Sequence, residues 1–348
     1  MTPPKKNRVL YVDNLRIIAC FLVILTHSAM PATDYEQNIE HAGFWLYLIS
    51  FIGSPASELF LAISGTVLLP IKISTKEFYK RRFVKLLPPV VFWSIFGVLL
   101  GWVVGENTGE MVFEKIISIP FKPTIGIYWF IYVMIGLYLF APVISAFLFV
   151  ASKQLVEWYL MIWIITLSMP WLCGLIGKDF DQNGSHYWML NYFGGFLGYW
   201  VLGSYLHQYP IKIGINRIWI ILCILSILYP LLIIVMRLNN IYANDYINNL
   251  QLGSAVLVTM LYTFVQNIKL SECVQTIITN IAKYSFGIYL VHYYLRDIVW
   301  VLFQDSKISS FPRSIVIALL VMSLSQIIIW ILSRMPYFGA YITGYKRR

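Results

Sequence analysis

The first long apolar stretch of the chain holds two side chains that could do chemistry, Arg16 and His27. They are eleven positions apart, close to three helical turns, so an α-helix would present both on one face, about 16 Å apart along its axis. Asp13 precedes Arg16 by three residues and is its natural ion-pair partner. An imidazole can act as a general base, and a guanidinium can orient anions or stabilise developing negative charge. Asp13, Arg16 and His27 are therefore candidate catalytic residues.

The composition indicates that these residues lie in a membrane. Of 348 residues, 59% are hydrophobic and 12% are charged, whereas a soluble domain has about 25% charged residues. Apolar runs of about twenty residues recur along the chain, as membrane-spanning helices require. We therefore expect an all-α, polytopic membrane bundle, with residues 1–348 forming one domain and the polar residues of the first run facing the bundle interior.

The apolar runs predict about ten transmembrane helices. The second run contains Gly53 and Pro55 and is expected to kink or break there. The predicted spans are residues 9–30, 43–69, 86–104, 125–150, 155–177, 190–207, 215–236, 251–268, 279–303 and 314–334.

Lysine and arginine are unevenly divided between the two sides that ten spans define. Since basic loops stay in the cytoplasm, the richer side predicts that both termini are cytoplasmic. Topology-setting cations also explain the formal net charge of +10, so no nucleic-acid partner is expected. The poorer side has Lys115, Lys122, Lys178, Arg237, Lys307 and Arg313. The richer side has Lys5, Lys6, Arg8, Lys72, Lys76, Lys80, Arg81, Arg82, Lys85, Lys153, Lys212, Arg217, Lys269, Arg334, Lys346, Arg347 and Arg348, with Lys283 just inside the membrane.

A second group of chemically capable residues, Arg81, Arg82 and Lys85, lies at the predicted cytoplasmic mouth of the third span. Arg82 and Lys85 are three positions apart, so a helix would turn both toward one ligand. Arginine binds phosphate through several hydrogen bonds and lysine adds a point charge. The cluster thus predicts an anion site, with a simple topology anchor as the alternative. The following Pro88-Pro89 fits the first turn of a new or kinked helix.

Two further spans carry polar residues. Glu58 is an intramembrane carboxylate, and Ser64-Gly65 permits close approach of a ligand or merely of a neighbouring helix. His292 lies mid-membrane, as either a hydrogen-bonded core residue or part of a cavity with Tyr289. Trp129 begins the fourth span, as a cavity-lining residue or an interfacial aromatic. The His, Cys and carboxylate residues show no metal-binding spacing, so no metal is expected.

Together these stretches resemble membrane-bound acyltransferase family 3, the integral-membrane O-acyltransferases of the bacterial surface. Its signature opens with Asp-x-Leu-Arg, and ten residues separate that Arg from a following His, as in residues 13–16 and His27. A Ser-Gly pair follows in its second span, six residues after an acid, as at Glu58 and residues 64–65. The Ser-x-Gly-Ile-Tyr-Leu-x-His of its late span matches residues 285–292.

The chain departs from the family pattern at two points. The Arg-x-x-Arg of the third span is similar to residues 82–85, where Lys85 replaces the second Arg. Since the two are not interchangeable at bidentate sites, Lys85 is expected to reshape that contact. The Trp-Phe-Leu-Tyr start of the fourth span resembles residues 129–132, but the His often found just before it has no counterpart.

The resemblance implies transfer of an acyl group, usually acetyl, from cytoplasmic acyl-CoA to a hydroxyl of a surface glycan or its lipid-linked precursor. The enzyme would be a multi-pass protein of the bacterial cytoplasmic (inner) membrane, surrounded by lipid. Acetyl-CoA would be a donor substrate, so no permanently bound cofactor is expected. Some members carry an extracytoplasmic hydrolase-like domain; here such a partner would be a separate protein, or absent.

A mechanism follows from the charges and the resemblance together. Arg81, Arg82 and Lys85 would hold the phosphates of the donor, with Ser64 and Gly65 beside it, and the pantetheine arm would pass Arg16. His27 would then act as general base or carry the acyl group covalently. Glu58 would orient His27 or pair with a cation.

Two other functions fit a polar membrane bundle. A transporter or flippase for a lipid-linked sugar or small anion also needs intramembrane ionisable residues and broken helices. The sequence shows no internal repeat and no matched pair of interrupted spans, which weighs against this alternative. A non-catalytic subunit of a glycan-assembly complex is the third possibility.

Overall fold

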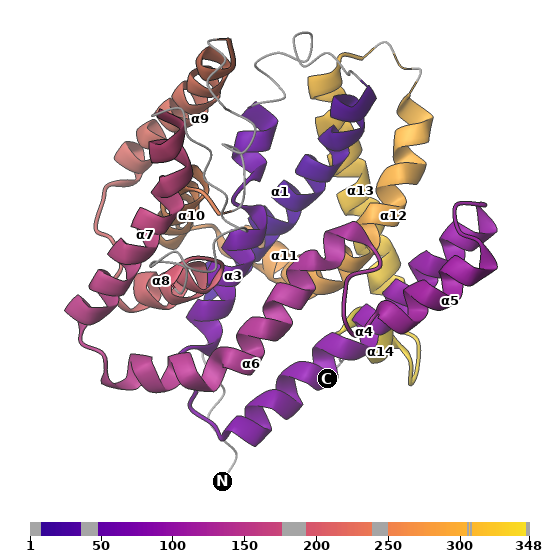
Figure 1. Ribbon diagram of the computed structural model, residues 1–348, viewed down its shortest axis with the longest axis horizontal. Helices are drawn as coiled ribbons and strands as arrows, with labels where there is room; N and C mark the ends of the chain where they lie inside the picture. Colours follow the sequence, from indigo (N-terminus) through magenta and orange to yellow (C-terminus); the bar gives the residue numbers. More distant parts are fainter. Residues whose placement is uncertain are drawn as a thin grey trace.

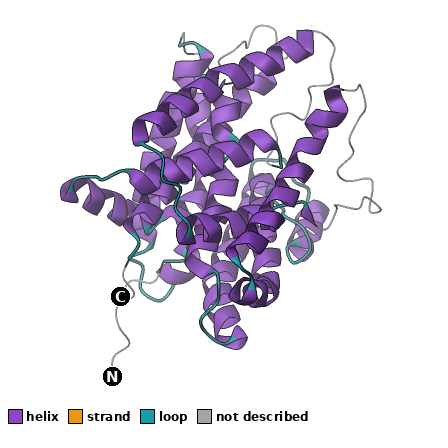
Figure 2. Cartoon of the chain, turned by 90° about the vertical axis from the view of Figure 1, so that its left-hand side faces the viewer, coloured by secondary structure: helices purple, strands orange, loops and turns teal. Residues whose placement is uncertain are grey.

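The computed structural model describes residues 8–35, 48–175, 193–238, 250–304, 306 and 308–345. Within these ranges the regular structure is helical, without strands (Figure 2). Seven helical stretches of the described chain are long and apolar enough to cross a membrane: Leu10–Ala29, Leu48–Leu68, Thr75–Val103, Gly126–Val150, Lys153–Cys173, Ser285–Phe303 and Ser310–Leu332. The predicted polytopic membrane bundle is confirmed.

The helices, labelled in Figure 1, are of three kinds: long helices, helices that cover other predicted spans, and short connecting helices. The long ones are α1 (Leu10–Tyr35), α3 (Ala56–Leu68) with the helical residues before it, α4 (Thr75–Val103), α6 (Trp129–Val150) with the 3₁₀ turn η1 (Gly126–Tyr128), α7 (Lys153–Leu175), α12 (Ser285–Phe303) and α13 (Ser310–Leu332). Three more cover other predicted spans: α8 (Leu197–Gln208), α9 (Ile215–Leu238) and α10 (Leu252–Asn267). The short connecting helices are α5 (Gly109–Ser118), α11 (Glu272–Ala282) and α14 (Gly339–Thr343).

Helix α1 lies at the centre of the bundle, between the α7–α10 group and the α12–α13 pair (Figure 1). It packs against α3, α11, α12 and α13. Its first half, with Leu15 and Ala19, belongs to one buried apolar cluster, and its second half, with Cys20 and Ile24, belongs to another. The polar residues that α1 carries are therefore surrounded by protein, as their cost in lipid requires.

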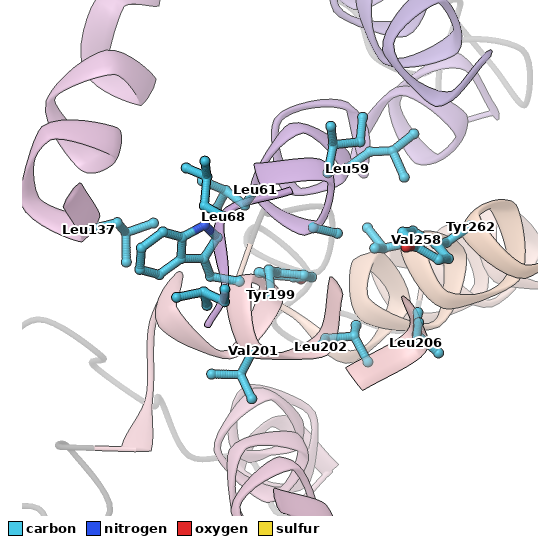
Figure 3. Close-up of a cluster of buried hydrophobic side chains, with 14 of the residues drawn as sticks. Leu59, Leu61, Leu68, Leu137, Tyr199, Val201, Leu202, Leu206, Val258 and Tyr262 are labelled. Atoms are coloured by element: carbon cyan, nitrogen blue, oxygen red, sulfur yellow. The ribbon is translucent and has the colours of Figure 1, made fainter. Parts of the chain in front are cut away.

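The first of these clusters is built around the crossing of α3 and α8 (Figure 3). Glycines let the two backbones approach closely, because a Cβ atom at Gly65 would lie 1.9 Å from the carbonyl oxygen of Trp200. A Cβ atom at Gly203 would likewise lie 1.9 Å from the carbonyl oxygen of Ala62. Small residues serve helix association in membranes in this way.

The expectation that a new helix starts at Pro88-Pro89 is wrong. Both prolines lie inside α4, which begins at Thr75, eleven residues before the predicted 86–104 span. Ser74 caps this helix by accepting a hydrogen bond from the backbone N–H of Glu77. The Ser-x-x-Glu spacing is a capping-box signal that the sequence already contained. The cationic residues thus sit on the first turns of a membrane helix.

Two other predicted spans are divided differently. The 190–207 segment contributes only α8 as a regular α-helix, whose 12 residues extend about 18 Å and are too short to span a bilayer alone. The 279–303 segment contains a turn at residues 283–284, which separates α11 from α12. Lys283 lies in this turn and donates to Oδ1 of Asn280. The apolar face of α11 made the two helices look continuous.

The break predicted in the second span is confirmed. Helical residues 48–53 end in a turn at residues 54–55, and α3 then begins at Ala56. A Cβ atom at Gly53 would lie 1.9 Å from Oγ1 of Thr26, so the glycine brings this segment against α1 beside His27. Residues 43–47 of the predicted span lie outside the described residues.

The α3–α8 crossing leads to a stability prediction. Gly65→Ala forces the two backbones apart and should destabilise the bundle by about 1–3 kcal/mol, the usual cost of overpacking. Gly136→Ala on α6 is the matched control, since a Cβ atom there meets nothing within 4 Å. Thermal unfolding of the purified variants should show a lower Tm for Gly65→Ala and an unchanged or higher one for Gly136→Ala. Equal Tm values for the two variants would show that the bundle does not depend on the close approach of α3 and α8.

Candidate active site

The imidazoles of His27 on α1 and His292 on α12 face one another inside the bundle. Nδ1 of His27 lies 3.0 Å from Nε2 of His292, and the ring planes differ by only 17°. His292 is fully buried, and its Nδ1 lies 2.5 Å from the backbone carbonyl oxygen of Tyr289. Two residues 265 positions apart therefore form one hydrogen-bonded unit.

These contacts determine which nitrogen of each ring carries a proton. The carbonyl oxygen of Tyr289 can only accept, so Nδ1 of His292 is its donor. The other nitrogen of a neutral imidazole is an acceptor, so Nε2 of His292 accepts from Nδ1–H of His27. Nε2 of His27 is then unprotonated and able to take a proton. A carboxylate orients the histidine of a Ser-His-Asp triad in the same manner; here an imidazole does so.

Arg296 supports the pair from the next turn of α12. Its side chain is buried against the ring of Tyr293, with the guanidinium carbon 4.1 Å from the ring centroid. One of its N–H groups donates to the backbone carbonyl oxygen of His27 at 3.4 Å, and Asp297 balances its charge. This contact joins the α1 backbone to α12 at the position of the candidate base.

His27 opens onto a cavity of about 310 Å³, the histidine cavity. No lysine, arginine or carboxylate is among its described lining residues, and five of these residues carry hydroxyl groups. Such walls suit a neutral ligand that exchanges hydrogen bonds with hydroxyls. The lining is Val23, Thr26, His27, Ser50, Gly53, Ser54, Ala56, Ser57, Ile127, Trp129, Phe130 and Tyr289.

A second cavity of about 270 Å³, the cationic cavity, has the opposite character. It is lined by Arg16, Arg81, Arg82 and Lys85, with no carboxylate among its described lining residues. Its remaining walls are largely apolar. They comprise Phe60, Ile63, Ser64, Val67, Leu68, Leu86, Phe130, Ile131, Met134, Tyr138, Ser285, Phe286, Tyr289 and Gly344.

The charges of this cavity are only partly balanced. Arg16 pairs with Asp13 at 3.0 Å, and Arg81 pairs with Glu77 at 2.6 Å. Arg82 forms no ion pair with any described residue, and its Nε is buried without a hydrogen-bond partner there. The half-buried guanidinium of Arg82 faces the ring of Phe78, with its carbon 5.8 Å from the ring centroid. Since a buried polar atom without a partner is costly, an anion at Arg82 would satisfy Nε.

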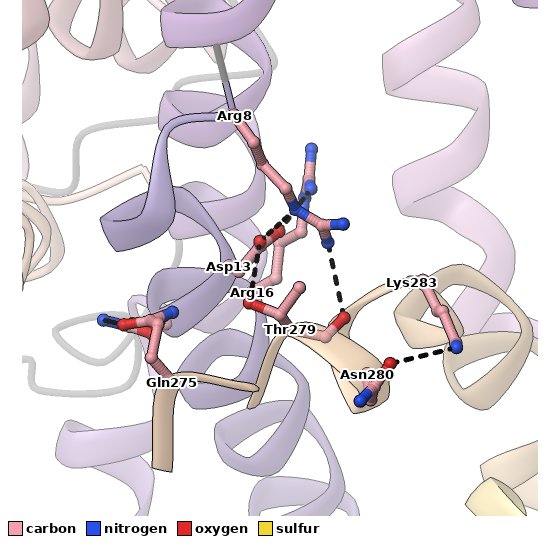
Figure 4. A network of polar contacts seen from close by, with 8 residues as sticks. Arg8, Asp13, Arg16, Gln275, Thr279, Asn280 and Lys283 are labelled. Atoms are coloured by element: carbon pink, nitrogen blue, oxygen red, sulfur yellow. Dashed lines mark hydrogen bonds and ion pairs between the residues drawn. The ribbon is translucent and has the colours of Figure 1, made fainter. Parts of the chain in front are cut away.

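Asp13 anchors the start of α1 rather than lining either cavity (Figure 4). Its buried carboxylate accepts from Arg8 at 2.5 Å and from Arg16 at 3.0 Å. Thr279 on α11 donates to it at 3.5 Å. One residue further on, Asn14 exchanges two amide hydrogen bonds with Gln275. Asp13 is thus a positioning residue, which holds the guanidinium of Arg16 and ties α1 to α11.

A family model described as an acyltransferase domain, acyltransferase 3, matches residues 9–334. The chain belongs to acyltransferase family 3. The matched range contains the histidine pair and all four cations of the cationic cavity. The protein is therefore a multi-pass membrane acyltransferase. No curated protein and no solved structure matched the chain.

The remaining predicted site residues of this acyltransferase occupy different surroundings. Ser64 lines the cationic cavity, and its Oγ accepts from the indole N–H of Trp200 at 3.0 Å. Gly65 instead packs on the α8 backbone, and this close packing explains why the residue is a glycine although it contacts no ligand site. Glu58 lines neither cavity. Neither of its buried carboxylate oxygens has a hydrogen-bond partner among the described residues, so the expected contacts with His27 or a cation are not formed there.

Trp129 and Tyr289 line the histidine cavity as expected, whereas several contributors were not anticipated. Phe130 lies inside the fourth-span motif and lines both cavities. A third cavity, the loop cavity, has about 740 Å³ and shares Arg81 and Arg82 with the cationic cavity. Its other lining residues include Lys72 and His207, which no local sequence signal distinguishes. No group of three or more His, Cys, Asp or Glu in the described ranges is placed to hold a metal ion.

The histidine pair predicts that His292 acts on catalysis by orienting His27. His292→Ala removes the acceptor and should lower kcat by about 10²-fold or more, within the range that general-base catalysis contributes. His292→Gln places an amide oxygen where Nε2 stands and should restore most of the rate. Acyl-transfer kinetics of the purified variants provide the measurement.

Thermal unfolding of both variants separates this role from a structural one. The two should have similar Tm values but different kcat values. Equal loss of kcat in the alanine and glutamine variants, at equal Tm, would show that hydrogen bonding to His27 is not what His292 supplies.

Proposed function

We propose that this acyltransferase moves an acyl group, in the simplest case acetyl, from cytoplasmic acyl-CoA to a hydroxyl of a cell-surface polysaccharide or its lipid-linked precursor. The observation that carries the proposal is the meeting of two unlike cavities in one bundle. One is lined by four cations, the other by an unprotonated imidazole nitrogen and hydroxyl groups. A donor that is anionic at one end and reactive at the other suits this arrangement.

The anionic end of the donor fits the cationic cavity. Arg82 presents a half-buried guanidinium that forms no ion pair among the described residues, and Arg81 and Lys85 line the same cavity. These three residues would bind the phosphates of coenzyme A. Arg81 and Arg82 also line the loop cavity, whose larger volume would accept the nucleotide portion. The apolar walls of the cationic cavity, such as Ile63 and Met134, would contact the pantetheine arm.

The thioester end of the donor would react beside His27. As the acceptor hydroxyl attacks the thioester carbonyl carbon, Nε2 of His27 takes its proton. The carbon–sulfur bond then breaks, and the departing thiolate receives that proton to give the free thiol of coenzyme A. In a covalent alternative, Nε2 itself attacks the carbonyl and carries the acyl group until the acceptor arrives. Arg16 lies in the cationic cavity, so its role is to orient the donor.

The acceptor is a neutral hydroxyl compound, in keeping with the walls of the histidine cavity. Ser50, Ser54 and Ser57 offer hydroxyl groups, and Trp129 offers a broad apolar ring. The basic-residue bias supports an orientation in which His27 lies toward the outer face of the membrane, which in this proposal is a bacterial cytoplasmic membrane. The transporter alternative has no observation of its own in its favour, and membership of an acyltransferase family argues for an enzyme.

Replacing His27 tests the assignment of the base. His27→Ala should reduce acyl transfer by at least about 10²-fold, the lower end of what a general base contributes. Expression and membrane insertion should be unchanged, because the side chain lines a cavity. Mass spectrometry of the surface glycans, with wild type and variant expressed in a strain lacking the gene, provides the readout. Glycans acylated to the wild-type level by the variant would remove His27 from the mechanism.

Replacing Arg82 tests the donor site. Arg82→Ala should raise the KM for acetyl-CoA by roughly 10- to 100-fold, since hydrogen bonds to charged groups contribute about 1.5–3 kcal/mol. The kcat should change little, as expected when a ground-state contact is lost. Lys80→Ala is the matched control, an exposed cation on α4 that lines none of the three cavities. An equal change of KM in Arg82→Ala and Lys80→Ala would show that Arg82 serves only to set the membrane topology.

A further inference from the structure

The cationic cavity and the histidine cavity have two lining residues in common, Phe130 on α6 and Tyr289 on α12. Everything else that lines one of them is absent from the other. The two aromatic rings therefore stand at the boundary between the arginine side and His27. Among the described lining residues, these two rings are the ones that a donor held by Arg82 would pass to reach the base.

The two rings close the boundary by direct contact. Their centroids lie 5.8 Å apart and their planes meet at 64°, the edge-to-face arrangement of a packed aromatic pair. Phe60 continues the aromatic wall on the cationic side, with its ring centroid 6.1 Å from that of Phe130. Since the two rings are in contact, a pantetheine arm that crosses the boundary between them requires one of them to move.

Tyr289 is held in place at both ends. Its hydroxyl donates to the backbone carbonyl oxygen of Ile127, and its own carbonyl oxygen accepts from His292. The side chain is almost fully buried. Moving Tyr289 would break the bond to Ile127 and disturb the helical turn that orients His292.

Phe130 has no polar anchor and is only half-buried. It packs against the rings of Phe60 and Trp129, and rotation about its two side-chain bonds costs no hydrogen bond. The difference in attachment identifies Phe130 as the ring that moves and Tyr289 as the ring that stays.

We propose that Phe130 is the movable half of an aromatic partition between the donor and acceptor cavities, and that its size determines which acyl groups reach His27. The inference rests on the proposed function. Rotation of the Phe130 ring admits the thin pantetheine arm with a small acyl group, whereas a long acyl chain requires a wider opening. The closed partition also keeps water on the histidine side away from a waiting thioester.

Truncating the ring should therefore have two effects. Phe130→Ala should lower the preference for acetyl-CoA over octanoyl-CoA by at least about tenfold, since a single methylene in an apolar site can be worth 10- to 200-fold. It should also raise hydrolysis without acceptor, in which water attacks the thioester carbonyl and yields a carboxylic acid and the free thiol. Release of coenzyme A thiol by the purified full-length protein, measured with each of the two donors and no glycan, reports both effects.

Three variants complete the test. Phe147→Ala makes the same substitution on α6 at a half-buried ring that lines none of the three cavities and should keep wild-type preference and hydrolysis. Phe130→Tyr retains a ring and should behave like wild type. Adding His27→Ala to Phe130→Ala should abolish the extra hydrolysis, because the thioester then meets no base.

The outcomes separate the partition from the function on which it rests. Wild-type membranes with their own glycans that consume no acyl-CoA would overturn the proposed function. Wild-type consumption with unchanged chain-length preference and hydrolysis in Phe130→Ala would overturn the partition alone. If Phe130→Ala does not fold, Phe130→Leu takes its place. It should also show a lower preference for acetyl-CoA and more hydrolysis, and no change in either would overturn the partition.

Discussion

Hydrocarbon offers no hydrogen-bond partner, and α1 carries a carboxylate, a guanidinium and an imidazole into the bundle. Each of these groups therefore has to be satisfied by the protein. Asp13 finds Arg8, Arg16 and Thr279, and His27 finds His292. These contacts fix α11 and α12 against α1, so the need to pair polar groups also positions the helices that build the site.

The same constraint separates the two kinds of chemistry. Cations that can attract an anionic donor gather where α1, α3, α4 and α6 enclose the cationic cavity. The histidine cavity contains no charged side chain among its described lining residues, and the base there is held by a neutral hydrogen-bonded chain through His292 to a backbone carbonyl. Donor binding and proton transfer are thus assigned to different places along one path.

Much of this arrangement could be predicted from the sequence. Hydropathy located the apolar helices, Gly53 and Pro55 marked a real break, and the spacing of Arg16 and His27 drew attention to α1. Local patterns failed where helices of similar character follow one another. The apolar residues of α11 and α12 read as one span, although a turn divides them.

What the sequence could not provide was the pairing of distant residues. His292 was recognisable as an intramembrane histidine, but its bond to His27 depends on how α12 packs against α1. Gly65 had two equally good interpretations until α8 was seen against it. Phe130 was one of many aromatics in an apolar helix, and only the shared wall of two cavities distinguishes it.

The central claim is that the acyl group enters from the Arg82 side and leaves from the His27 side. Sealed vesicles containing the purified protein in a single orientation, with radiolabelled acetyl-CoA on one face and the glycan acceptor on the other, test it most directly. The account predicts labelled acceptor only when acetyl-CoA faces the Arg82 side, and none with His27→Ala. Labelling with donor and acceptor confined to the same face, or from either face equally, would contradict it.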